Sequence, residues 1–181
     1  MSRPAKTLFA VLVAMVAVSA QAASADAKRH PCASRPSALV DRLEARTACW
    51  INRVRARRHL RPFRVNHRLG RAAAGHASDM VRHCYFAHTS LAGATIADRV
   101  RRAGYLSGSR SWMAGEAIAW MSRRRHPART VVRMWMHSPP HRELLVSPRL
   151  RELGVGIVRG VPACHGGGFT FVADMGRRWG R

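Results

Sequence analysis

The sequence predicts a single α+β domain in which helices come first and strands close the chain. Apolar residues recur at helical spacing through the first half, whereas two β-rich segments, "LGVGIVR" (153–159) and "FTFVADM" (169–175), lie near the end. No internal repeat or linker separates these two parts. Helices that precede strands in this way indicate packed layers of helix and sheet around one core.

Four segments have the periodicity or the boundary residues of helices. Ser37 is placed to cap the first, and the apolar residues of the second fall three or four positions apart. Thr95 and Asp98 form a capping-box pattern at the start of the third, and Pro127 suits the first position of the fourth. The predicted helices span about 37–58, 66–84, 96–103 and 127 to the Ser-Pro-Pro sequence at 138–140.

The first residues have the pattern of a cleaved secretory signal peptide. Arg3 and Lys6 precede an apolar run over 8–20 that is too short to span a bilayer, and A-x-A sites end at Ala22 and Ala25. With no later segment apolar enough for a membrane helix, we expect the mature chain outside the cytoplasm, secreted, periplasmic or in the cell envelope. The expected boundaries are 1–25 for the signal peptide, 26–37 for a polar leader and 38–178 for the folded domain.

Four cysteines remain in this oxidising compartment, so two disulfides are expected. Three pairings are possible. We favour Cys32 with Cys49, which would hold the leader against the first helix and contribute about 3 kcal/mol in the chain-entropy model. Cys84 then pairs with Cys164. No cysteine or histidine spacing is typical of a zinc finger.

The chain carries thirty-two basic and nine acidic residues, a formal net charge of +23. Such a surface attracts nucleic acid, anionic lipid and anionic wall polymers without specificity. The arginines are spread along the chain, with no interleaved aromatic residues and no DNA-reading motif. We therefore expect a solvated arginine surface and no specific nucleic-acid partner.

One of the rare acids, Glu116, stands in "AGEAIAW" (114–120), and the apolar stretch around 115–121 is short enough for a strand. A buried carboxylate without a partner costs several kcal/mol, so Glu116 is expected to have one. His76 lies on the apolar stripe of the second helix, and we expect a packed, hydrogen-bonded core histidine there rather than a ligand.

The order of the motifs resembles the CAP superfamily, which includes secreted cysteine-rich proteins, venom antigens, plant pathogenesis-related proteins and bacterial relatives. The resemblance covers roughly residues 40–176 and implies a three-layer α-β-α sandwich. It is carried by "CWINRVRARRHLRPFRVN" (49–66), "LGRAAAGHASDMVRHCYFAH" (69–88), "DRVRRAGY" (98–105), "AGEAIAW" (114–120), "VVRMWMHSPPHRELL" (131–145), "LGVGIV" (153–158) and "FTFVADMG" (169–176).

The resemblance implies a cleft in which His88, Glu116 and His141 can hold a divalent cation such as zinc. Two imidazoles and a carboxylate suit zinc and leave a fourth position for water. The fourth position of the family's site falls at or near Ser138, which is not acidic, as in the bacterial branch. His137 is expected to be exposed or to lie beside the cleft with Ser138, because two prolines separate it from His141. A hydrogen-bonded His–Glu–His cluster without metal is the open alternative.

Two positions depart from the bacterial pattern, because Ala117 and Leu144 stand where relatives often carry asparagine. The polar network of the cleft is therefore expected to be thinner than usual.

Three classes of function follow. A binding module for a small apolar ligand or a cell-envelope component ranks first, and a cationic protein that adheres to anionic envelope polymers ranks second. A metal-dependent hydrolase ranks third, because Glu116 would be a ligand and no other base is evident. The sequence thus favours binding over catalysis.

Overall fold

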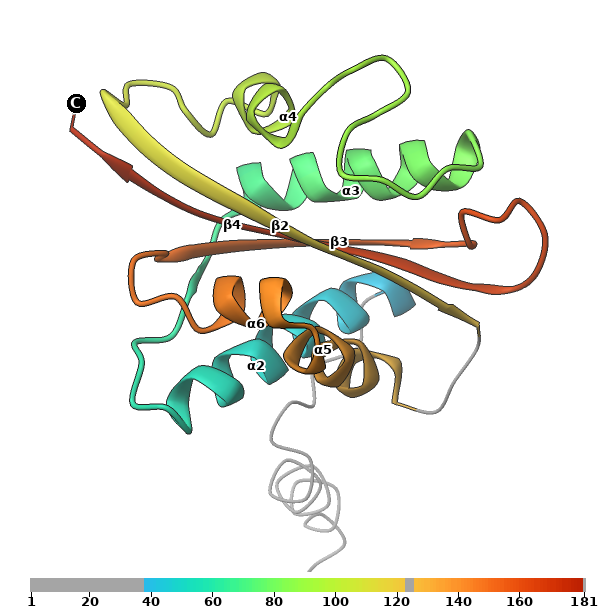
Figure 1. Cartoon of the computed structure of the whole chain (residues 1–181), viewed down its shortest axis with the longest axis horizontal. Helices are drawn as coiled ribbons and strands as arrows, with labels where there is room; N and C mark the ends of the chain where they lie inside the picture. Colours follow the sequence, from blue (N-terminus) through green and yellow to red (C-terminus); the bar gives the residue numbers. More distant parts are fainter. Residues whose placement is uncertain (1–37, 123–125, 181) are drawn as a thin grey trace, which may run out of the picture. The chain divides into compact units, whose positions relative to one another are not determined.

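A four-stranded sheet lies between two layers of helices (Figure 1). The structure is a computed structural model and describes residues 38–122 and 126–180. The helices are α2 (Leu39–Ala56), α3 (His67–Arg82), α4 (Ile96–Arg102), α5 (Pro127–His137) and α6 (Pro139–Leu145). The strands are β1 (Arg64–Val65), β2 (Ser111–Ser122), β3 (Glu152–Arg159) and β4 (Gly168–Trp179).

The strands are ordered β1-β3-β4-β2, so β2 lies at one edge of the sheet. The short β1 pairs with β3 in parallel, and the other pairs are antiparallel. In this register Glu116 of β2 lies opposite Asp174 of β4. The indole N–H of Trp135 on α5 donates to the carbonyl of Ile118 at 3.1 Å, which ties that helix to the edge strand.

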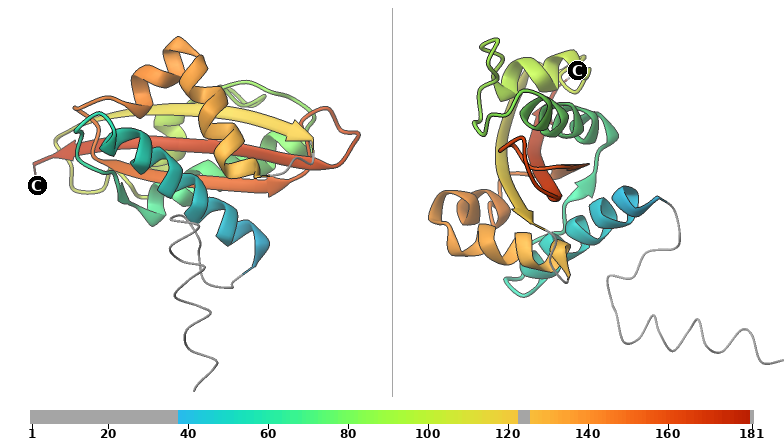
Figure 2. Two further views of the ribbon diagram at one scale, coloured as in Figure 1. Left: turned by 90° about the horizontal axis from the view of Figure 1, so that it is seen from below. Right: turned by 90° about the vertical axis from the view of Figure 1, so that its right-hand side faces the viewer.

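The two helical layers bury separate apolar clusters against the sheet. Helices α3 and α4 cover one face, and α2, α5 and α6 cover the other (Figures 1 and 2). The larger cluster lies on the α2–α5–α6 side, where Ile51, Trp135 and Leu145 pack against apolar side chains of the sheet. This arrangement confirms the predicted α-β-α sandwich.

Helix α3 approaches the sheet at two glycines of β3. A Cβ added at Gly154 would stand 2.0 Å from the backbone nitrogen of Gly70, and one at Gly156 would stand 2.0 Å from that of Ala74. No side chain fits between the two backbones at these points. The spacing of α3 from the sheet is therefore set by main-chain contact.

The predicted helices and strands are present, with some shifts in their ends. Strand β2 is longer than the predicted 115–121 segment. The Ser-Pro-Pro sequence does end α5, but Pro139 also begins α6, which the sequence analysis missed, since proline fits the first turn of a helix. Asn66 caps α3 by accepting from the backbone nitrogens of Arg68 and Leu69.

The expectation that the arginines are solvated is wrong for two of them. Arg55 is fully buried, donates to the carbonyls of Leu145 and Ser147, and stacks on Phe63. Arg99 is also buried. In both cases hydrogen-bond acceptors within the fold replace water around the guanidinium.

The disulfide between Cys84 and Cys164 is present and joins the end of α3 to the β3–β4 connection. Cys49 is disulfide-bonded as well. Its predicted partner Cys32 lies outside the described residues, as do the predicted signal peptide, the leader and Ser37. Over residues 38–122 and 126–180, no helix has the length and apolar character needed to cross a membrane.

Candidate functional site

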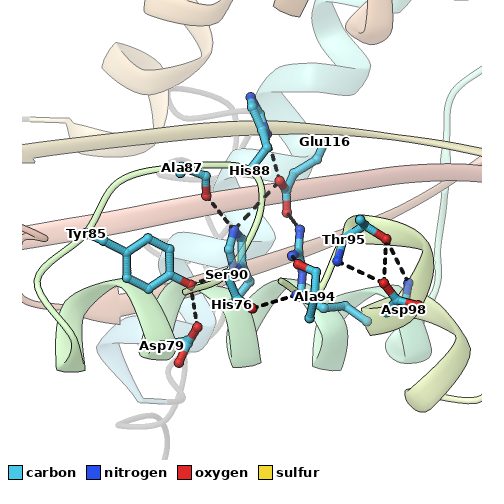
Figure 3. A network of polar contacts seen from close by, with 11 residues as sticks. His76, Asp79, Tyr85, Ala87, His88, Ser90, Ala94, Thr95, Asp98 and Glu116 are labelled. Atoms are coloured by element: carbon cyan, nitrogen blue, oxygen red, sulfur yellow. Dashed lines mark hydrogen bonds and ion pairs between the residues drawn. The ribbon is translucent and has the colours of Figure 1, made fainter. Parts of the chain in front are cut away.

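The buried carboxylate of Glu116 is held from two sides. Its Oε2 lies 2.7 Å from Nη2 of Arg99. Its Oε1 lies 2.7 Å from Nδ1 of His88 (Figure 3). Nε2 of His76 is 3.8 Å from the same Oε1. The partners expected for Glu116 are therefore the buried Arg99 and one of the two predicted histidines, His88.

Arg99 reaches Glu116 from α4, whose start is fixed by a complete capping box between Thr95 and Asp98. The Nη1 of Arg99 donates to the carbonyl of Ala94 at 2.8 Å, which orients the guanidinium. The permanent positive charge of this group compensates the carboxylate inside the protein. The pair leaves little net charge at the centre of the site.

His88 lies on the loop between α3 and α4, and 57% of its side chain is exposed. A carboxylate only accepts hydrogen bonds, so Nδ1 carries the proton that is shared with Glu116. In the neutral ring Nε2 is then an acceptor. Glu116 thus fixes the tautomer and the orientation of an imidazole that solvent can reach.

His141 stands in the first turn of α6, and its ring centroid is 6.4 Å from that of His88. Helix α6 can come this close because Gly115 has no side chain: a Cβ there would lie 2.4 Å from the Leu144 side chain. Burial, and then the neighbouring His88, lowers the pKa of His141 and favours its neutral form.

The three predicted residues thus meet only in part. His88 contacts both of the others, but no hydrogen bond or ion pair joins His141 to Glu116 among the residues that the structure describes. We refer to His88, Glu116 and His141 as the β2-edge site, because the edge strand lets side chains of both helical layers come together there.

Asp174 is a second buried acid, which sequence reasoning missed. It lies opposite Glu116 on β4 and is fully buried, and within the described chain no donor reaches either of its carboxylate oxygens. Burial, and then the charge of Glu116, raises its pKa well above the usual value. The protonated carboxyl can donate to Glu116, so a neutral Asp174 suits this position.

His76 anchors the loop that carries His88. Its Nε2 donates to the carbonyl of Ala87 at 2.9 Å, and the Tyr85 hydroxyl donates to Asp79 beside it (Figure 3). Burial lowers the pKa of His76 and keeps the ring neutral. The prediction of a packed, hydrogen-bonded core histidine is confirmed.

The model of the CAP family, the cysteine-rich secretory proteins, matches residues 50–174. The chain belongs to this family.

A curated relative of this CAP domain is the uncharacterized protein YkwD of Bacillus subtilis, which is 28% identical over 131 residues. The match covers 72% of this chain but only 48% of that protein, so the chain spans about half the length of its relative.

Solved structures share the fold. An extracellular protein of Bacillus anthracis that contains an SCP domain superposes with a TM-score of 0.57 at 24% identity, covering 78% of this chain and 44% of that one. An outer surface protein of Borrelia burgdorferi gives a TM-score of 0.60 at 21% identity, over 73% and 90% of the two chains. At these identities the likeness establishes the fold of the CAP domain alone.

The two residues expected beside the site of the CAP domain lie where α5 meets α6. His137 is exposed, and its Nδ1 donates to the carbonyl of Arg133 in its own helix at 2.7 Å. Ser138 is half-buried, ends α5 and precedes α6. His137 is thus exposed, which is one of the two positions expected for it.

The donor set of the CAP domain does not fit a resident zinc ion. Across residues 38–122 and 126–180, no three His, Cys, Asp or Glu side chains are arranged to hold a metal. Both oxygens of Glu116 already face partners, and a divalent cation there would stand against the guanidinium of Arg99. In this arrangement both oxygens of Glu116 are engaged, one of them in orienting His88.

Proposed function

We propose that this CAP domain is an extracytoplasmic binding module that takes a small, largely apolar ligand at the β2-edge site. The predicted signal peptide supports the location, as does the Cys84–Cys164 disulfide, since disulfides persist in oxidising compartments. Two proteins of the same fold are described as extracellular and as an outer surface protein, which agrees with it.

The observation that carries the binding function is the fixed orientation of His88. A surface histidine that is hydrogen-bonded at Nδ1 to a buried carboxylate presents Nε2 in one orientation, beside the neutral ring of His141. The oriented imidazole of His88, with the ring of His141 beside it, can bind a hydroxyl or carboxyl group of a ligand. Such pre-organisation reduces the entropy that binding must overcome.

The loop around His88 also exposes large apolar side chains. Phe86 is 45% exposed and Leu91 is 72% exposed, on either side of His88 in the chain. Exposed large apolar residues beside oriented polar groups are typical of ligand-binding surfaces. They supply contacts for the apolar part of a ligand whose polar group meets the histidines.

A neutral amphiphile tests this proposal. We expect octyl glucoside, below its critical micelle concentration, to cause saturable amide chemical-shift changes at Phe86, His88 and Leu91. His88→Gln should weaken binding at least tenfold, whereas His137→Gln, which replaces another exposed histidine, should leave it unchanged. Equal affinities for the two variants, or no saturation in the wild type, would contradict the proposal.

Hydrolysis is the second candidate, and one observation favours it. The His88–Glu116 pair has the arrangement of a general base that a carboxylate orients. No serine, threonine or cysteine side chain within the described residues is hydrogen-bonded to His88, so water would be the nucleophile. Turnover of ester or peptide substrates that disappears in His88→Gln would establish hydrolysis, and an absence of turnover would leave binding as the function.

A further inference from the structure

A cavity lies between α3 and α4, apart from the β2-edge site. Its volume is about 480 Å³, within the range of small-molecule sites, and neither His88, Glu116 nor His141 lines it. Arg99 belongs to both places, since it lines this cavity and binds Glu116 on its other side.

The cavity exists because its walls are made of very small side chains. Ala72 and Gly75 on α3 face Ala103, which follows α4, and none of the three extends beyond Cβ. A Cβ added at Gly75 would meet nothing within 4 Å. The space is therefore open beside Gly75, with apolar surface at Ala72 and Ala103.

The charged groups of the cavity are mainly basic. Arg71 and Arg102 line it from the two helices and are exposed, and Arg99 lines it from within the fold. The one acid in the lining is Asp79, which accepts a hydrogen bond from Tyr85 and lies 2.8 Å from Nδ1 of His83. Both of its carboxylate oxygens therefore already have partners within the protein.

Arg99 adds a third guanidinium to the wall of the cavity. Only 9% of its side chain is exposed, and within the described chain its Nε has no hydrogen-bond partner. Its Nη1 and Nη2 bind Ala94 and Glu116. Glu116 balances the charge of Arg99. The exposed guanidiniums of Arg71 and Arg102 therefore favour an anionic occupant.

We propose that this α3–α4 cavity binds a small organic anion, a carboxylate carried on a compact apolar body. The apolar body would lie against Ala72, Gly75 and Ala103, and the carboxylate would face Arg102 and Arg71. This site is separate from the β2-edge site, so either proposal can hold without the other.

Three probes in 150 mM sodium chloride test the proposal by amide chemical shifts. Benzoate carries both the charge and the apolar body, benzyl alcohol carries the body alone, and inorganic phosphate carries the charge alone. We expect benzoate to saturate at the amides of Ala72, Gly75 and Ala103 and to bind at least tenfold more tightly than the other two. Absence of saturable benzoate binding would overturn the proposal, and phosphate or benzyl alcohol binding equally well would overturn the assigned ligand class.

Two variants locate the binding. Gly75→Leu fills the open space and should weaken benzoate at least tenfold without lowering the melting temperature, because leucine is the better helix former. Arg102→Gln should weaken it several-fold, whereas Arg101→Gln removes the same charge from a neighbouring residue that does not line the cavity. Equal losses at 101 and 102, or no loss in Gly75→Leu, would show non-specific attraction to a cationic surface and overturn the site.

Discussion

The guanidinium of Arg99 and the carboxylate of Glu116 form a buried pair with a 2.7 Å contact. Glu116 comes from the edge strand of the sheet and Arg99 from a short helix in the layer above it. The pair joins the β2-edge site to the α3–α4 cavity. Breaking it would leave one buried charge without its partner.

Arg99→Met should therefore destabilise the protein by about 3–5 kcal/mol, the usual cost of removing one member of a buried ion pair. Urea denaturation at pH 7 measures this loss. Arg101→Met is the matched control, because its ion pair with Asp98 is exposed and worth at most about 1 kcal/mol.

The double variant Arg99→Met/Glu116→Gln removes both charges together. It should recover much of the stability that Arg99→Met loses, since no uncompensated carboxylate remains. Strictly additive losses in this cycle would contradict a direct interaction between the two side chains.

Asp174 should make the stability depend on pH. Because its folded-state pKa lies well above that of the unfolded chain, its contribution is fully present below about pH 4 and is lost as the pH rises toward the folded-state pKa. Asp174→Asn cannot ionise, so its stability advantage over the wild type should grow from pH 4 upward. Urea midpoints between pH 4 and pH 8 measure the difference, and parallel curves for the two proteins would refute the prediction.

Removal of divalent metal should leave the protein as stable as before. The charge of Glu116 is balanced within the chain by Arg99, so the fold has no need of an external cation at this position. Melting temperatures with and without EDTA should agree within about 1 °C, which is well below the shift that 1 kcal/mol produces in a domain of this size. A fall of several degrees with EDTA that added zinc reverses would instead indicate a structural metal.

The Cys84–Cys164 disulfide closes a segment of 80 residues. In the chain-entropy model a loop of that length contributes about 4 kcal/mol, mainly by restricting the unfolded chain. The variant with Cys84→Ala and Cys164→Ala should show this loss in urea denaturation under non-reducing conditions, where the disulfide of Cys49 is retained. A midpoint equal to that of the wild type would show that the segment is already constrained without the bond.

Much of the fold follows from sequence periodicity, but the side chains that pair with Glu116 at the site do not. Glu116 is identifiable because a rare acid stands in an apolar strand, and Asp174 in "FTFVADM" carries the same signal. Arg99 is one basic residue among thirty-two, and nothing local marks it as buried. Its role depends on where α4 packs, which is a tertiary property.

The start of α6 shows a second limit of local reasoning. Two consecutive prolines correctly end one helix, yet the same residues are compatible with the first turn of the next. The position of His141 beside His88 then depends on Gly115, whose missing side chain admits Leu144 of α6. Such a contact links residues far apart in the sequence.

The glycines at 154 and 156 determine which parts of this molecule can vary. Since α3 rests on β3 through the main chain, changes of side-chain volume elsewhere in the core have no direct route by which to shift this helix. The same helix carries His76, whose Nε2 lies 3.8 Å from Oε1 of Glu116. In the loop over 83–95, Cys84 and His88 are bonded to the rest of the fold, whereas exposed positions such as Phe86 and Leu91 are the ones we expect to vary, and the ligand with them.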